Sequence, residues 1–109
     1  MPWTVESLNE TVDKELQALP ADMRARFTRI CELISSVGLE RVGAPHVRHL
    51  RGPLWEMRMS GKAGISRALF VANKEDTRVV IVRAFIKKTM KTPRREIDLA
   101  LRRAKEVAG

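Results

Sequence analysis

The stretch that decides the fold runs from Arg78 to Arg95 and reads RVVIVRAFIKKTMKTPRR. Its beginning, Arg78–Val82, is β-branched almost throughout, which is typical of a central strand buried on both faces. Residues 83–95 then hold six Lys or Arg and no acidic residue. Thr92 and Pro93 predict a helix start, with Thr92 as the N-cap and Pro93 at the first helical position. The sequence therefore predicts a group of cations between a central strand and the last helix.

Two further strands precede this one. Leu54–Met59 alternates between two faces, which predicts that Trp55, Met57 and Met59 lie in the core. A flexible turn leads to a second strand over 65–72, and another turn leads into the central strand. We expect a three-stranded antiparallel meander, with Arg58 and Arg67 on neighbouring strands in positions that allow them to face the same way.

The N-terminal half predicts a short strand and two helices. Pro2–Val5 is suited to an edge strand. Apolar residues recur at helical spacing over 7–19, before Pro20, and again over 23–37, before Gly38, which suits a left-handed cap. Two amphipathic helices with a short link predict a hairpin that covers one face of the sheet. Their outward charges are of mixed sign, which indicates a solvated surface.

The segment 39–53 is polar and rich in Gly and Pro, and it predicts a loop. It contains His46 and His49, which are spaced to share a metal, but no cluster of cysteines or carboxylates completes a ligand set. We therefore expect neither a metal nor another cofactor. Either histidine remains a candidate proton carrier, because imidazole titrates near neutrality.

Charge is distributed unevenly along this single predicted domain of 109 residues. The net charge is +8 and the pI is about 10.6. Residues 1–40 carry four Lys or Arg against seven Asp or Glu, whereas residues 41–109 carry 17 against six. Such a basic surface attracts phosphate backbones or an acidic protein partner.

Cys31 is the only cysteine, so an internal disulfide is impossible and a reducing cytoplasm is the simplest setting. Its place in a helical apolar pattern predicts a small core residue. No apolar run approaches the roughly 18 residues of a membrane span, and no secretory leader pattern occurs. We expect a cytoplasmic protein that does not contact a membrane.

The chain resembles the phage-derived, HigB-type branch of the RelE/ParE toxin superfamily in three segments: Leu54–Arg58, Ser66-Arg67 and Phe85–Pro93. The resemblance spans the whole chain. It implies an α+β, RelE-like fold of order β-α-α-β-β-β-α: a short N-terminal strand, a helical hairpin, a three-stranded antiparallel meander and a C-terminal helix. It also implies a type II toxin–antitoxin toxin that inhibits translation as a metal-independent endoribonuclease on mRNA, often at the ribosome. The implied inhibitor is a cognate antitoxin, usually a helix-turn-helix protein encoded next to the toxin.

The same resemblance implies a site made of cations. RNA cleavage without metal needs a base for the 2′-hydroxyl, cations at the phosphate and an acid for the leaving oxygen. Arg67, Lys87 and Lys88 are the implied catalytic residues, with Arg67 and Lys88 at the phosphate and Lys87 or Lys88 as the proton carrier. The further implied phosphate-binding residues are Arg58, Lys91, Arg94 and Arg95.

Several alternatives remain open at this stage. The chain has no tyrosine, so the general base could be His46, His49, Glu56 or a lysine. Arg58 or Arg67 could instead form a cross-strand pair with Glu56. Two other functions fit a basic domain of this kind: a ParE-like toxin that acts on DNA gyrase, and an inactive nucleic-acid-binding accessory protein.

Overall fold

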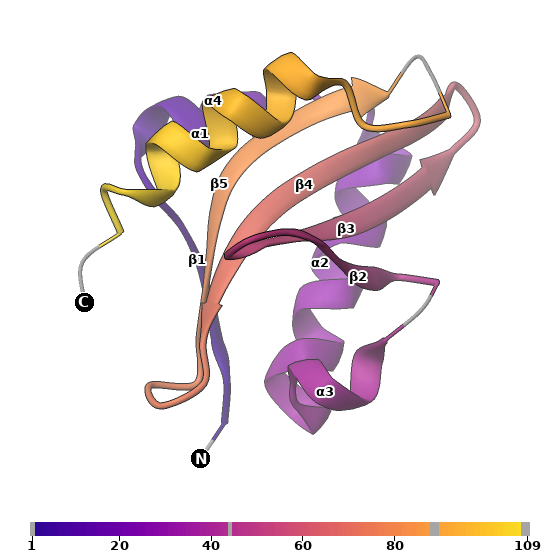
Figure 1. Cartoon of the computed structure of the whole chain (residues 1–109). Coiled ribbons are helices and arrows are strands. Elements are labelled where there is room, and N and C mark those ends of the chain that lie inside the picture. The colour runs from indigo at the N-terminus through magenta and orange to yellow at the C-terminus, as the bar shows by residue number, and fades with distance from the viewer. Residues whose placement is uncertain (1, 44, 88–89, 108–109) are drawn as a thin grey trace.

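A mixed sheet forms the centre of the computed structural model, which describes residues 2–43, 45–87 and 90–107 (Figure 1). Within these residues the sheet has five strands in the order β1-β5-β4-β3-β2. The strands are β1 (Thr4–Ser7), β2 (Val47–Arg51), β3 (Leu54–Gly61), β4 (Gly64–Asn73) and β5 (Arg78–Lys87). The helices are α1 (Glu10–Gln17), α2 (Ala21–Val37), α3 (Leu39–Val42) and α4 (Arg94–Ala104).

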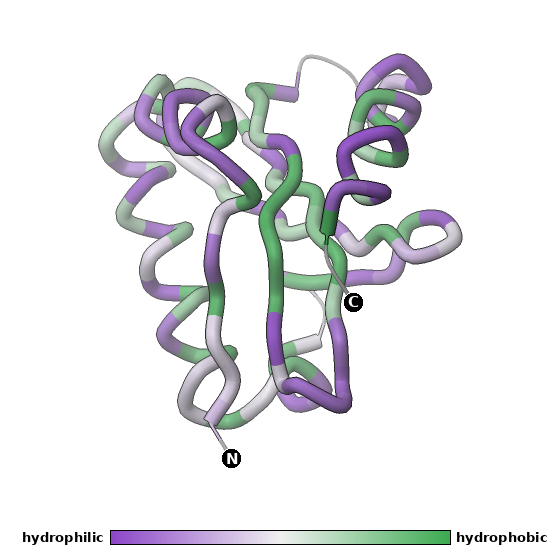
Figure 2. The backbone as a smooth tube through the Cα atoms, turned by 90° about the vertical axis from the view of Figure 1, so that its left-hand side faces the viewer, coloured by the Kyte–Doolittle hydropathy of each residue, from purple (hydrophilic) through white to green (hydrophobic). Residues whose placement is uncertain are grey.

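Strand β5 is the central strand that the sequence predicted. It pairs in parallel with β1 and antiparallel with β4, and the residues 79–82 are all buried. Figure 2 shows β5 as largely hydrophobic, next to a hydrophilic turn at its start. The predicted meander is confirmed as β3-β4-β5, and the N-terminal strand is confirmed at the sheet edge.

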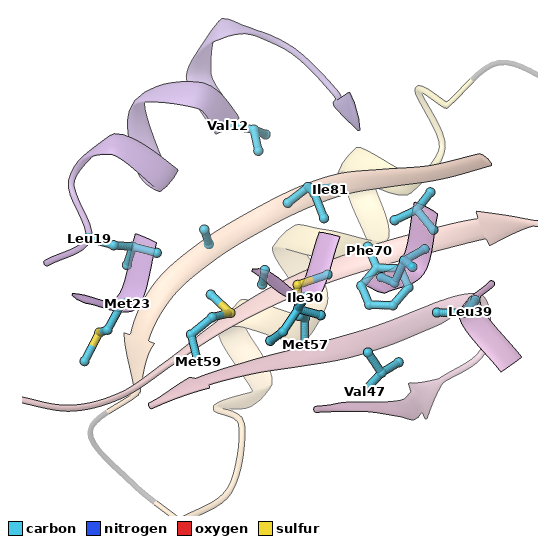
Figure 3. Close-up of a cluster of buried hydrophobic side chains, with 14 residues drawn as sticks. Val12, Leu19, Met23, Ile30, Leu39, Val47, Met57, Met59, Phe70 and Ile81 are labelled. Carbon is cyan, nitrogen blue, oxygen red and sulfur yellow. The ribbon is translucent and has the colours of Figure 1, made fainter. Parts of the chain in front are cut away.

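Two hydrophobic layers hold the helices on opposite faces of the sheet. On one face, α1 and α2 pack against the strands, and Figure 3 shows Val12 beside Ile81 and Ile30 beside Met57. As predicted, both helices cover the same face, where α1 lies on β5 and α2 lies on β3. On the other face, α4 buries Ile97 and Ala100 against a second group that includes Leu54, Leu69 and Phe85. Helix α4, which follows β5 in the chain, therefore lies on the face of the sheet away from α2.

Two smaller expectations for α2 are also confirmed. The helix ends at Val37, and Gly38 follows with a φ of +88°, a conformation that side chains rarely allow. Cys31 is partly buried against the α1 and α2 core layer, and burial raises the pKa of its thiol to about 12. The thiol is therefore protonated at neutral pH and packs as a small apolar group. No helix in the described part of the chain is long and apolar enough to span a membrane.

The predicted loop over 39–53 is wrong in two places. The short helix α3 follows Gly38 directly, and the edge strand β2 pairs antiparallel with β3. β2 forms because Val47, opposite Met57, is buried in the core, while the strand's exposed charged residues suit a sheet edge. The polar composition of β2 therefore reflects its position at the edge of the sheet.

A cluster of charges joins α1, β5 and α4 where β1 ends. β1 stops opposite Ile81, so the backbone of β5 beyond it has no strand partner on that side. The carboxylate of Glu15 in α1 accepts a hydrogen bond from the Ala84 amide at 3.2 Å and pairs with Arg83 and Arg103. Arg83 also pairs with Glu96 of α4 at 2.7 Å. One side chain of α1 therefore completes the strand edge and anchors α4.

We expect Glu15→Ala to destabilise the protein by about 2–4 kcal/mol, because it leaves the Ala84 amide without an acceptor and removes one of the two acceptors of each mostly buried arginine, Arg83 and Arg103. Urea unfolding measures the free energy change. The matched control is Glu10→Ala in the same helix, whose side chain is 86% exposed and lies 3.9 Å from Lys14. The control should change stability by less than about 0.5 kcal/mol. Equal losses in the two variants would contradict this account of the edge.

Candidate nucleic-acid interface

A cleft of about 670 Å³ opens on the α4 face of the sheet, next to the segment that leads from β5 into α4. It is lined from four neighbouring strands or the segments beside them. Its lining includes the polar residues His46, Arg48, Glu56, Arg58, Arg67 and Lys87. Four cations against one carboxylate give the lining a formal excess of three positive charges at neutral pH. The cleft is therefore suited to a polyanion.

The strand register brings three predicted site residues together. Arg58 of β3 lies directly opposite Arg67 of β4, and Ile65 of β4 lies opposite Lys87 of β5. Residues two apart on a strand share a face, so Arg58, Arg67 and Lys87 lie on the α4 side. Cations from three adjacent strands therefore converge in the cleft, whereas the described cations at the entry to α4 do not line it.

Glu56 lies beneath these cations and is 1% exposed. One carboxylate oxygen, Oε1, accepts a hydrogen bond from Nε of Arg48 at 2.8 Å and another from Nη1 of Arg67. The other oxygen, Oε2, accepts a hydrogen bond from the hydroxyl of Thr92. The cross-strand pair that the sequence offered as an alternative is therefore present for Arg67.

Arg67 retains an unused donor despite this pairing. Its side chain is 6% exposed, and its buried Nε has no hydrogen-bond partner. Burial lowers the pKa of the guanidinium, as do the nearby charges of Arg48 and Arg58, while Glu56 raises it. An arginine nevertheless remains protonated at neutral pH. A buried cationic donor without an acceptor is costly.

Lys87 lies among like charges. Its pKa is lowered, first by partial removal from water and then by Arg67 and the other cleft arginines, with Glu56 opposing the shift. Its ammonium group donates to the carbonyl of Met90. A lysine with a lowered pKa can take up and release a proton more readily than an ordinary surface lysine.

Three further predicted site residues, all described by the structure, do not line the cleft. Lys91, Arg94 and Arg95 are exposed, the last two in the first turn of α4. Lys88 lies outside the described residues. The predicted N-cap is wrong: α4 begins at Arg94, Pro93 occupies the N-cap position, and the Thr92 hydroxyl points to Glu56. A buried carboxylate therefore takes the hydroxyl that the sequence assigned to the helix end.

The sequence analysis missed Arg48, which belongs to the strand predicted as a loop. Its signal is the alternation in Val47–Arg51, where Arg48 lies between two residues on the other face. His46 lines the cleft, whereas the His49 ring lies 5.4 Å from Trp55 and 2.7 Å from the Gly52 carbonyl. Because Trp55 packs on the α2 face, the two histidines lie on different faces and are not placed to share a metal. Among the described residues no group of three or more metal-ligating side chains occurs.

Solved structures of RelE toxins have the same fold. A free double mutant of Escherichia coli RelE matches with a TM-score of 0.64 at 14% identity, over 94% of this chain and 98% of that one. A chain of the Mycobacterium tuberculosis RelBE2 toxin–antitoxin complex matches with a TM-score of 0.59 at 23% identity, over 80% of this chain and 100% of that one. A chain of the Pyrococcus horikoshii RelE–RelB complex matches with a TM-score of 0.56 at 22% identity, over 81% of this chain and 98% of that one. The expected RelE-like fold is therefore confirmed.

The family follows from a separate match. The chain belongs to the family described as Phage derived protein Gp49-like (DUF891), whose model matches residues 14–105. The resemblance to the phage-derived branch of the RelE/ParE superfamily is thereby confirmed. No protein with a curated description matches the sequence.

We expect inorganic phosphate to bind in this cleft, because its lining carries an excess of positive charge. Arg58→Ala should weaken binding about tenfold, since it removes an exposed cation of the lining without disturbing Glu56. NMR titration at constant ionic strength measures the affinity. Arg102→Ala, on the exposed surface of α4, is the matched control and should bind phosphate as the unchanged protein does. Equal weakening in both variants would indicate attraction to the overall charge rather than binding in the cleft.

Proposed function

We propose that this protein is the toxin of a type II toxin–antitoxin pair and that it cleaves mRNA as a metal-independent endoribonuclease, in association with the ribosome. Family membership and the RelE-like fold support the class of protein. The observation that carries the activity is the cleft itself, whose lining holds four cations against one buried carboxylate. A phosphodiester is an anion that such a lining can bind.

The proposed reaction uses residues near the start of β4 and at or after the end of β5. Arg67 and Lys88 bind the scissile phosphate and stabilise the charge that builds on its oxygens. Lys87, in its neutral form, takes the proton from the 2′-hydroxyl, and the 2′-oxygen attacks phosphorus. The bond to the 5′-oxygen breaks, and a protonated lysine or His46 supplies a proton to the leaving oxygen. The products are a 2′,3′-cyclic phosphate and a 5′-hydroxyl.

Glu56 is a poor choice for the general base in this reaction. It is buried, and its two oxygens already accept hydrogen bonds from two arginines and a threonine. A base must lie within hydrogen-bond reach of the proton that it removes, and Glu56 is covered by its donors. His49 is excluded as well, because it lies on the α2 face. Lys87 and His46 are the candidates that face the cleft.

The exposed cations outside the cleft extend this proposal along the RNA. Arg58 lies at the cleft itself, while Lys91, Arg94 and Arg95 lie at the entry to α4. We propose that these four residues bind phosphates on either side of the scissile bond. Contacts of this type supply affinity without base specificity and weaken as salt increases.

The proposed partner is a cognate antitoxin. Relatives of the fold come from toxin–antitoxin complexes of Mycobacterium tuberculosis and Pyrococcus horikoshii, which supports a similar partner here. We propose a helix-turn-helix protein encoded in the adjacent reading frame, and a cytoplasmic pair. Inspection of that reading frame tests the proposal at little cost.

Lys87→Met should reduce RNA cleavage by about 100- to 10,000-fold, because it removes the proposed proton acceptor while retaining a similar side-chain volume. Induced expression with primer extension on a reporter transcript measures cleavage in cells. The corresponding assay with purified protein is run with and without purified ribosomes. The exposed Lys105→Met serves as the control and should cleave normally. Growth arrest with intact transcripts would overturn the nuclease proposal and favour a toxin that acts on gyrase.

Cleavage should increase with pH as Lys87 loses its proton. The lysine acts as a base only when neutral, and its pKa lies below the usual 10.5 because of partial burial and the cleft arginines. Activity should therefore rise through this lowered pKa and reach a plateau above it. Single-turnover rates on a short RNA give the profile. A residual rate in Lys87→Met that follows the same pH profile would assign the proton transfer to another group.

A further inference from the structure

The buried carboxylate of Glu56 connects the cleft to the segment that leads into α4. We propose that Glu56 and Thr92 together are positioning residues, which orient Arg67 and set the place of Lys87 without contacting the RNA. This inference rests on the proposed nuclease function and names residues that act through the proposed catalytic groups. Three contacts carry it, and each comes from a different part of the fold.

The first step is the set of donors around Glu56. The carboxylate lies on β3, and its donors come from Arg48 on β2, Arg67 on β4 and Thr92 between β5 and α4. Moving a carboxylate out of water costs several kcal/mol, and hydrogen bonds to ionised donors offset that cost. Two bonds from charged arginines and one from a neutral hydroxyl, all to one 1%-exposed carboxylate, fix the relative positions of these elements.

The second step is the effect on Arg67. Its Nη1 is held by Glu56, so the plane of the guanidinium is fixed with Nε facing no protein acceptor. An arginine in solvent would lose rotamer freedom when it binds an anion, whereas this one has already lost it on folding. Glu56 therefore holds the guanidinium in place at the wall of the cleft, where the part of the side chain that remains exposed can donate to a phosphate oxygen.

The third step is the link to Lys87. Thr92 ties the residues after β5 to Glu56, and Lys87 donates from its ammonium group to the carbonyl of Met90 in the same segment. The position of the Lys87 nitrogen therefore depends on where Thr92 holds that segment. Loss of the hydroxyl would move the proposed base relative to Arg67, although neither charged group is removed.

The behaviour of Thr92 argues against a purely local structural role. A threonine before a helix usually caps it, yet the N-cap position of α4 has no side-chain hydrogen bond, and the hydroxyl goes to Glu56. The start of α4 therefore lacks a side-chain cap, and the hydroxyl instead stabilises the buried carboxylate. A hydroxyl used in this way serves the arrangement of the cleft.

The test compares Thr92→Val, which removes only the hydroxyl at nearly constant volume, with Thr92→Ser, which retains it. We expect Thr92→Val to lower kcat for a short RNA about tenfold to a hundredfold, with KM changed less than about threefold, and Thr92→Ser to restore most of kcat. Wild-type kcat in Thr92→Val would overturn the inference. Equal loss in both variants would also overturn it, because the hydroxyl would then not be the group that matters.

The pH profile separates the two positioning residues. The charged and titratable groups of the cleft around Lys87 are Arg67 on β4, Arg58 and Glu56 on β3, Arg48 on β2 and His46 before it. Glu56 raises the pKa of Lys87 against the arginines, so Glu56→Gln should move the rise in activity to lower pH. Thr92→Val leaves every charge in place, so it should lower the plateau and move the rise less than Glu56→Gln does. A larger shift in Thr92→Val than in Glu56→Gln, or no shift in Glu56→Gln, would contradict these roles.

A measurement that does not depend on cleavage distinguishes failure of this inference from failure of the proposed function. In ¹H–¹⁵N spectra of the arginine side chains, the Nε proton of Arg67 should be slow to exchange and should shift when inorganic phosphate is added. In Thr92→Val both effects should weaken, and in Thr92→Ser they should persist. If the protein cleaves no RNA but the spectra behave in this way, the nuclease proposal fails and the positioning of Arg67 remains. Unchanged spectra in Thr92→Val would refute the positioning itself.

Discussion

The arrangement of the cleft depends on one buried negative charge among four positive ones. Without Glu56, three guanidinium groups and an ammonium group would repel one another at the end of the sheet. With it, two arginines converge on a single oxygen, and a threonine occupies the other. Its donors come from strands on both sides of β3 and from the entry to α4. Burying this carboxylate costs free energy, but its hydrogen bonds hold the cationic side chains of the cleft in place.

The two faces of the sheet differ: one packs against the main hydrophobic core, and the other holds the cleft. The α1 and α2 side is apolar and closely packed, with Met57 and Phe70 among its fully buried residues. The other side is covered by α4 over only part of its length, and the cleft occupies part of the area that α4 leaves uncovered. Alternation along β3 accounts for this division, since Met57 and Met59 face one layer while Glu56 and Arg58 face the other. Strand residues on rigid, two-sided elements hold the cations in fixed positions.

Local patterns in the sequence predicted most of this fold, and they failed where the tertiary partner decides. The β-branched run identified β5, and the alternation over 54–59 identified β3 with its correct inward face. β2 was missed because an edge strand needs few apolar residues, and its pairing with β3 is a long-range contact that composition does not encode. Thr92 was misassigned for a related reason. A helix cap is a local preference, and a buried carboxylate 36 residues away competes for the same hydroxyl.

The candidate site was predictable in its charge but not in its connections. Arg58, Arg67 and Lys87 could be grouped because strand order and register follow from short turns. That Glu56 accepts from three donors, and is therefore not available as a base, required coordinates. Arg94 and Arg95 follow the basic stretch in sequence, yet the turn into α4 takes them away from the cleft.

The parallel pairing of β1 with β5 has a consequence for the order of events during synthesis. Thr4 pairs with Arg78, so β1 has no partner in the sheet until β5 has left the ribosome. The cleft needs Arg48 from β2 and Thr92 from the entry to α4, so it too is completed only after β5 has been made. A nascent chain therefore carries the first cations of the cleft well before it can arrange them.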